Sequence, residues 1–136
     1  MYFVDSNMWC YYLDSAAKEH TLVASYLDNL MKKEKLAMNF IVLMEVAHYV
    51  IKRLGPLQGK EKLQFFLTYP FVLEDFDYEL LIASIDKLCQ HSHTGIGGRD
   101  ATIIATMESL EIKKLITHDR AFRYINSITV FDPLDT

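Results

Sequence analysis

Apolar residues in this chain gather in short runs that alternate with longer segments of helical periodicity. Five runs rich in aromatic and β-branched residues predict buried strands, at residues 2–4, 36–38, 71–73, 115–117 and 128–131. Between them, apolar residues recur every three or four positions and predict helices with one apolar stripe each. Two such series are Ile82, Ile85, Cys89 and Ile103, Met107, Leu110. The alternation predicts βαβ units, and therefore an α/β fold with a parallel sheet covered by helices on both faces.

Glycine and proline interrupt this pattern densely at only two places, residues 55–56 and 95–98, and both predict loops. The rest of the sequence holds no repeat, low-complexity tract or linker, so we expect one domain over residues 1–136. With 51% hydrophobic and 24% charged residues, the composition excludes a disordered or collagen-like protein.

The sequence carries no sign of secretion or of a membrane span. Cys10 and Cys89 are too few and too far apart for a disulfide framework or a thiolate zinc site. Asp5 follows the first apolar residues and no basic segment precedes it, which argues against a signal peptide. No apolar run approaches the roughly 18 residues of a membrane span. We therefore expect a cytoplasmic protein with no membrane partner.

Two carboxylates follow predicted strands at positions where parallel sheets bind ligands. Asp5 comes directly after the first strand, and Asp119 lies two residues past the fourth. In open α/β sheets, ligands bind beyond the carboxyl ends of the strands, near the point where the strand order reverses. Each Asp could instead cap the helix that follows it, so both interpretations stay open at this point.

Two further acids lie on predicted helices. Glu45 is part of a segment, residues 40–47, whose pattern predicts a helix that is apolar almost all round. A lone carboxylate buried there is costly unless it meets a cation or hydrogen-bond donors, which favours a paired or metal-facing Glu45 over a solvated one. Asn39 is a good N-cap for that helix. Asp100 opens another helix, where it either stabilises the helix N-terminus or joins the other acids.

The charge balance connects the four acids. The chain has 14 basic and 18 acidic residues, so without Asp5, Glu45, Asp100 and Asp119 the two signs would be equal. Carboxylates crowded in one cleft repel one another unless a cation neutralises them. Oxygen ligands without Cys favour Mg²⁺ or Mn²⁺ over Zn²⁺. The net charge of −4 argues against a nucleic-acid binder of the purely electrostatic kind.

Competing motifs are weaker. Glu45 and His48 have the Glu-x-x-His spacing of di-iron bundles, but no second copy is present. His91 and His93 lack further zinc ligands placed near them, and a solvated helix end explains them better. The glycine loop at residues 95–98 lacks the Lys-Ser/Thr pair of a phosphate loop. Neither cysteine has a paired histidine that would activate it.

Four segments carry the acids in a recognisable order. Residues 2–7 contain an Asp-x-Asn element after a strand, residues 39–50 carry Glu45, residues 98–105 carry Asp100 and residues 115–122 carry Asp119. In this order and spacing, over nearly the whole chain, the segments resemble the motifs of the PIN domain family and, within it, the VapC-type toxins of toxin–antitoxin pairs. An aspartyl-nucleophile phosphatase of the haloacid dehalogenase type is a weaker alternative, because that family typically has Asp-x-Asp where this chain has Asp5-Ser6-Asn7.

The resemblance implies a three-layer α/β/α sandwich around a parallel five-stranded sheet of order 3-2-1-4-5. It also implies a metal-dependent endoribonuclease, with Asp5, Glu45, Asp100 and Asp119 as catalytic residues around one or two Mg²⁺ or Mn²⁺ ions. In that strand order the first and fourth strands are neighbours at the switch point, which independently predicts that Asp5 and Asp119 meet. Asn7 and Thr117 carry over as accessory polar groups. Arg99 and Arg120, the other accessory residues, flank two of the acids, where each could contact phosphate or form an ion pair with a site carboxylate.

The resemblance further implies an RNA substrate, an antitoxin protein as partner and a homodimer. Scattered basic residues are candidate RNA contacts: Lys32, Lys33, Lys52, Arg53, Lys60, Lys62, Arg120 and Arg123. Residues 11–13 and 65–67 are candidates for a self-association or antitoxin patch, although core packing is the favoured alternative. A PIN-like module that binds RNA or partners without cutting is the alternative function.

Overall fold

The computed structural model describes residues 1–135 and contains a five-stranded parallel sheet. Its strands are β1 (Tyr2–Val4), β2 (Leu36–Asn39), β3 (Val72–Glu74), β4 (Lys114–Ile116) and β5 (Thr129–Phe131). Their order in the sheet is β3-β2-β1-β4-β5, and every neighbouring pair is parallel. The predicted sheet and its order are therefore confirmed. β1 lies at the centre, and the chain moves outward to β2 on one side and to β4 on the other.

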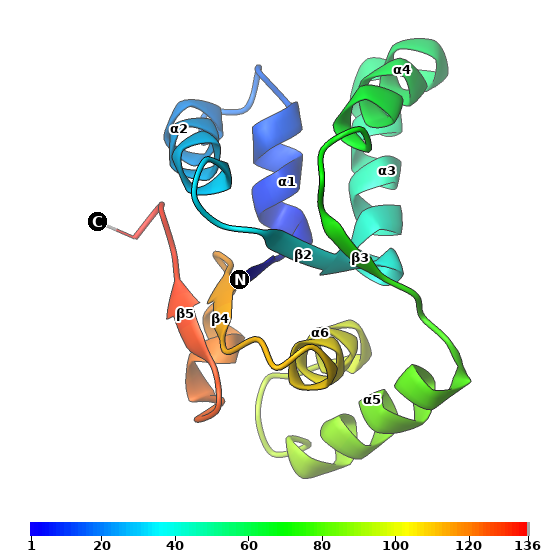
Figure 1. The fold of residues 1–136 in the computed structure, drawn as a ribbon, viewed down its shortest axis with the longest axis vertical. Coiled ribbons are helices and arrows are strands. Elements are labelled where there is room, and N and C mark those ends of the chain that lie inside the picture. The colour runs from blue at the N-terminus through cyan, green and yellow to red at the C-terminus, as the bar shows by residue number, and fades with distance from the viewer. Residues whose placement is uncertain (136) are drawn as a thin grey trace.

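Helices cover both faces of the sheet. They are α1 (Ser6–Leu13), α2 (His20–Met31), α3 (Phe40–Leu54), α4 (Pro56–Phe66), α5 (Tyr78–Gln90), α6 (Gly98–Ser109) and the short 3₁₀ helix η1 (Arg120–Tyr124). Figure 1 shows α1 to α4 on one side of the strands and α5 and α6 on the other. The three-layer α/β/α arrangement is therefore confirmed.

Polar caps make the chain turn from strand into helix at one edge of the sheet. Asp5 follows β1 and starts α1, Asn39 ends β2 and starts α3, and Asp119 follows β4 and starts η1. In each case a side-chain oxygen accepts a hydrogen bond from a backbone N–H of the first turn, which would otherwise lack a partner. Because the strands are parallel, these caps gather at their carboxyl ends.

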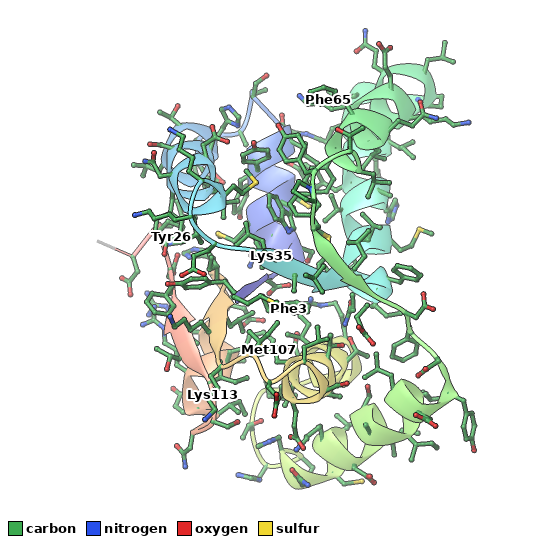
Figure 2. All side chains as sticks on the ribbon, in the orientation of Figure 1. Phe3, Tyr26, Lys35, Phe65, Met107 and Lys113 are labelled. Atoms are coloured by element: carbon green, nitrogen blue, oxygen red, sulfur yellow. The ribbon has the colours of Figure 1, made fainter. Side chains whose placement is uncertain are left out.

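The core lies between the sheet and its two helical layers. Figure 2 shows Phe3 on the central strand and Met107 on α6, and both are buried, whereas Phe65 on α4 is exposed. On α1, Trp9 is fully buried; its ring packs edge-on against Phe66, with the centroids 5.0 Å apart, and lies tilted against Phe71 at 5.1 Å. Aromatic edge-to-face packing of this kind stabilises the layer that carries Asp5.

Two predicted apolar faces are not buried. On α5, Ile82 is 42% exposed and Ile85 48% exposed, because this helix packs on α6 through a different face that includes Leu80. On α3, the side chains of Phe40 and Met44 are exposed, because only one side of this helix faces the core. Periodicity identifies an apolar face but does not say which neighbour will cover it.

The segments proposed as an association patch divide between core and surface. Leu13 and Phe66 are buried in the core, whereas Phe65 and Leu67 are exposed. Among residues 1–135, no helix is long and apolar enough to cross a membrane.

Candidate active site

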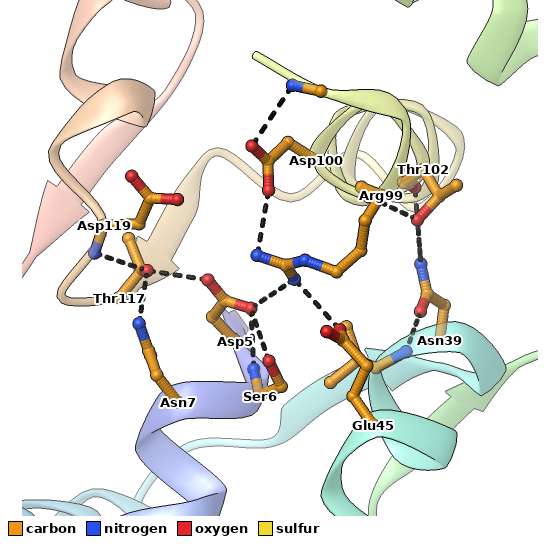
Figure 3. A network of polar contacts seen from close by, with 12 residues as sticks. Asp5, Ser6, Asn7, Asn39, Glu45, Arg99, Asp100, Thr102, Thr117 and Asp119 are labelled. Atoms are coloured by element: carbon orange, nitrogen blue, oxygen red, sulfur yellow. Dashed lines mark hydrogen bonds and ion pairs between the residues drawn. The ribbon is translucent and has the colours of Figure 1, made fainter. Parts of the chain in front are cut away.

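The four acidic residues come from four elements and converge at the carboxyl edge of the sheet, as Figure 3 shows. Asp5 follows β1, Glu45 lies on the second turn of α3, Asp100 lies on the first turn of α6, and Asp119 follows β4. Asp5 is fully buried, Asp100 is nearly so, and Asp119 and Glu45 are partly exposed. The cluster thus has a closed floor formed by Asp5 and an open side at Glu45 and Asp119.

A single guanidinium group bridges three of these acids. Arg99 Nη1 lies 2.8 Å from Asp5 Oδ1 and 3.3 Å from Glu45 Oε1, and Arg99 Nη2 lies 2.9 Å from Asp100 Oδ1. The Arg99 side chain is 30% exposed, so it reaches the cluster from its open side. Of the two roles open to Arg99 from the sequence, a phosphate contact or an ion pair with a site carboxylate, the structure contains the ion pair.

Thr117 connects Asp5 to Asp119 and to Asn7. Its buried hydroxyl donates a hydrogen bond of 2.7 Å to Asp5 Oδ2. The same oxygen accepts from the Asp119 backbone N–H at 3.0 Å and from Asn7 Nδ2 at 3.5 Å. β4 pairs directly with β1, with Val4 opposite Ile116, which is why residues 112 positions apart meet here.

Each of three acids also has a local structural role. Asp5 Oδ1 accepts from the Ser6 N–H at 2.6 Å, Asp119 Oδ1 from the Ala121 N–H at 2.9 Å, and Asp100 Oδ2 from the Gly97 N–H at 3.4 Å. Helix capping and membership of the acidic cluster are therefore not alternatives, because the same side chains do both.

Burial and neighbouring charges shift the pKa values of Glu45, Asp100 and Arg99. Burial raises the pKa of Glu45, an effect that Asp5 strengthens and that Arg99 only partly offsets. Burial likewise raises the pKa of Asp100, against the opposing influence of Arg99 and the Gly97 N–H. Burial disfavours the charged form of Arg99, but the neighbouring carboxylates outweigh it and raise the pKa of Arg99, so this side chain stays cationic.

Asn39 joins the helices that carry Glu45 and Asp100. Its Oδ1 accepts from the Val42 N–H at 2.8 Å, which confirms the predicted cap of α3. Its Nδ2 donates to Thr106 Oγ1 at 3.1 Å and lies 3.3 Å from Thr102 Oγ1, both on α6. The link to α6 was not predicted, because a threonine pair at i, i+4 inside an apolar helix signals nothing without knowledge of its neighbour.

Other residues considered in the sequence do not bridge the acids as Arg99 does. Arg120 is exposed and forms no ion pair within residues 1–135, unlike Arg99. Arg53 pairs with Asp14, and Arg123 with Asp135, so these two cations serve structural ion pairs. Burial, with help from Glu45 and Asp5, raises the pKa of Cys10 to about 12, which keeps it a thiol at neutral pH.

The donor set fits a hard divalent cation. All the groups offered are carboxylate or amide oxygens, the ligands that Mg²⁺ and Mn²⁺ prefer. Two buried oxygens at the site, Asn7 Oδ1 and Glu45 Oε1, have no hydrogen-bond partner within residues 1–135, although the latter lies within ion-pair distance of Arg99. In the same part of the chain, no three His, Cys, Asp or Glu side chains are arranged as a complete metal site.

A parallel α/β sheet of this order, with carboxylates at its switch point, defines the class of protein. The chain belongs to the PIN domain family, whose model matches residues 2–127. This membership decides against the aspartyl-nucleophile phosphatase that Asp5 alone would permit. No curated protein matches the sequence.

Three solved structures illustrate the similarity. VapC20 of Mycobacterium tuberculosis, described as a sarcin-ricin loop cleaving toxin, is 18% identical over 93% of this chain and 95% of its own, with a TM-score of 0.78. VapBC2 of Rickettsia felis, bound to a promoter DNA fragment, is 22% identical over 96% and 97%, with a TM-score of 0.75. A toxin–antitoxin complex of Klebsiella pneumoniae is 19% identical over 100% of both chains, with a TM-score of 0.76. These similarities establish the fold.

Proposed function

We propose that this PIN domain protein is a Mg²⁺- or Mn²⁺-dependent endoribonuclease and the toxin of a VapBC-type toxin–antitoxin pair. The observation that carries the proposal is the convergence of Asp5, Glu45, Asp100 and Asp119, from four separate elements, at one edge of the sheet. Burying like charges together lowers stability, so such a cluster needs a reason other than folding.

The four acids would hold one or two divalent cations, and Asn7 Oδ1 is a further oxygen within the same cluster. When bound, the metal would activate water for attack on phosphorus and stabilise the leaving oxygen. Asp5 has its orientation fixed by Thr117 and by the Ser6 N–H, so it serves as the rigid ligand. Glu45 is 41% exposed on its side chain and stands at the open side, where a substrate phosphate would enter.

The proposed substrate is RNA, and a metal ion in the site removes the objection raised by the net charge of −4. Arg120, exposed beside Asp119, is a candidate phosphate contact because it has no carboxylate partner within residues 1–135. Since one structural relative is a sarcin-ricin loop cleaving toxin, RNA containing that loop is a suitable first substrate, together with tRNA.

The proposed partners are an antitoxin and a second copy of the chain, and a cytoplasmic location belongs to the same proposal. A groove of about 790 Å³ runs along α3 beside Glu45 and is lined mainly by apolar side chains, including Ile41, Met44 and Ile51. The exposed apolar stripe of α5 is a second surface of this kind. Exposed apolar patches mark interaction sites, and several structural relatives are toxin–antitoxin complexes.

The test is cleavage of labelled RNA by the purified protein in Mn²⁺, with EDTA as the metal-free control. We expect the Asp5→Asn and Asp100→Asn variants to lose roughly 100-fold or more of the cleavage rate while staying folded by circular dichroism. Asp86→Asn, which removes an exposed carboxylate from α5, is the matched control and should cut like the wild type. Near-normal turnover by either site variant would remove these acids from the catalytic site.

The same experiment separates the nuclease from a silent PIN-like binding module. A silent module would bind the RNA in a filter or gel-shift assay and leave it intact in Mn²⁺ at every concentration. The nuclease is favoured because all four acids are present and meet in space, whereas a binding module has no need to retain a complete carboxylate cluster.

A further inference from the structure

Arg99 occupies the middle of the acidic cluster, where a divalent cation would have to bind. Its two terminal nitrogens contact carboxylates from β1, α3 and α6 at 2.8, 3.3 and 2.9 Å. One guanidinium thus takes the place of a bridging cation among acids that would otherwise face one another.

The oxygens that Arg99 contacts are the ones that a metal would need. Asp5 Oδ2 is already bound by the Thr117 hydroxyl, and Asp100 Oδ2 by the Gly97 N–H. Asp5 Oδ1 also accepts from the Ser6 N–H, and it and Asp100 Oδ1 are the oxygens directed at the middle of the cluster, where Arg99 contacts both. A metal and the guanidinium therefore compete for the same atoms.

The Arg99 side chain is placed where a cation that binds the acids could displace it into solvent. Arg99 is the second residue of α6, its side chain is 30% exposed, and it enters from the open side of the cluster.

We infer that Arg99 is the internal counter-ion of the metal-free site, and that a divalent cation binds by displacing it. Arg99 then has two opposite effects: it stabilises the metal-free fold by neutralising the acids, and it weakens metal binding by competing for their oxygens. The inference rests on the proposed metal-dependent function, and it assigns to Arg99 control over the metal concentration at which the site fills.

The experiment is titration of Mn²⁺ into metal-free protein by calorimetry, together with thermal unfolding of the same samples in EDTA. Lys113→Gln is the matched control, because it also removes one positive charge, but Lys113 is exposed before the amino end of β4, away from the acids, and has no ion pair within residues 1–135. We expect Arg99→Gln to bind Mn²⁺ with a Kd roughly tenfold lower than the wild type, since a competing charge at contact distance is removed. Lys113→Gln should stay within about twofold, as expected for a solvent-screened charge outside the site.

Thermal unfolding supplies the second measurement. In EDTA, Arg99→Gln should unfold at a lower temperature than both the wild type and Lys113→Gln, and saturating Mn²⁺ should remove that difference. If the metal-free Arg99→Gln protein cannot be purified, Arg99→Lys replaces it, because one ammonium group cannot bridge three carboxylates and should give a smaller gain in Mn²⁺ affinity in the same direction.

The outcomes separate this inference from the proposed function. Wild-type protein that binds Mn²⁺ while Arg99→Gln binds it equally or more weakly would overturn the counter-ion role and leave the metal site in place. A wild-type protein and variants that all fail to bind Mn²⁺ would overturn the metal-dependent function, and the displacement with it.

Discussion

Replacing Asn39 with Ala tests how the fold holds Glu45 and Asp100 in one site. Asn39 is fully buried at the end of β2, and the substitution removes both its acceptor and its donors. Loss of the cap on the Val42 N–H costs about 1 kcal/mol. Loss of the 3.1 Å hydrogen bond to Thr106, with the longer contacts to Thr102, costs about 1–2 kcal/mol more in a site closed to water. The expected decrease in the free energy of unfolding is therefore about 2–3 kcal/mol.

Asp77→Ala is the matched control, because Asp77 also caps a helix after a strand but has no second role. Its carboxylate accepts from the Leu80 N–H at 2.9 Å, and the residue is exposed. Urea unfolding of this variant should show a loss of about 1 kcal/mol, the contribution of a cap alone. The link between α3 and α6 is then the difference between the two variants, about 1–2 kcal/mol. A difference below about 0.5 kcal/mol would refute the argument that the Asn39 amide joins the two helices energetically.

Two further predictions concern acid stability and assembly. The hydrogen bond from Tyr49 lowers the pKa of Asp14, so the ionised Asp14 carboxylate stabilises the fold above its unfolded pKa of 3.8, and this stabilisation is lost as the pH falls through the folded pKa. The free energy of unfolding in urea should therefore depend on pH less steeply below pH 4 in Asp14→Asn than in the wild type. Equal slopes in the two proteins would contradict this. A homodimer predicts a light-scattering mass of about twice 15.8 kDa at micromolar concentration, and a mass of one chain would count against it.

The sequence allowed prediction of those features that depend on local chemistry and on strand order. Caps such as Asn39 and Asp119 could be predicted because a polar side chain between a strand and a helix is placed to accept a hydrogen bond from the first turn of that helix. The meeting of Asp5 and Asp119 followed from the order of the strands, since parallel strands that are neighbours bring their carboxyl ends to the same point.

What could not be predicted depends on which surfaces meet. The pattern of Ile82 and Ile85 predicted a helix with an apolar stripe but not what the stripe would contact, and in the structure it is exposed, because α5 is an outer helix that packs on α6 through a face that includes Leu80. Arg99 and Arg120 looked equivalent in sequence, each beside a site acid. Only Arg99 turns into the cluster, because α6 directs its first turn toward β1. Periodicity and neighbourhood in sequence carry no information on such relative orientations.

Asp14 and Asp100 show how the same residue type, at similar burial, can serve stability or function. Their exposed fractions are 4% and 8%, yet the pKa of Asp14 is lowered and that of Asp100 is raised. Asp14 accepts hydrogen bonds from the Tyr49 hydroxyl and the Ala16 N–H and forms an ion pair with Arg53, whereas Asp100 shares one guanidinium with two other carboxylates. Protein folding favours the first arrangement, because every charge has its own partners. The second has too few partners for its charges, and a ligand cation is the group that would complete it.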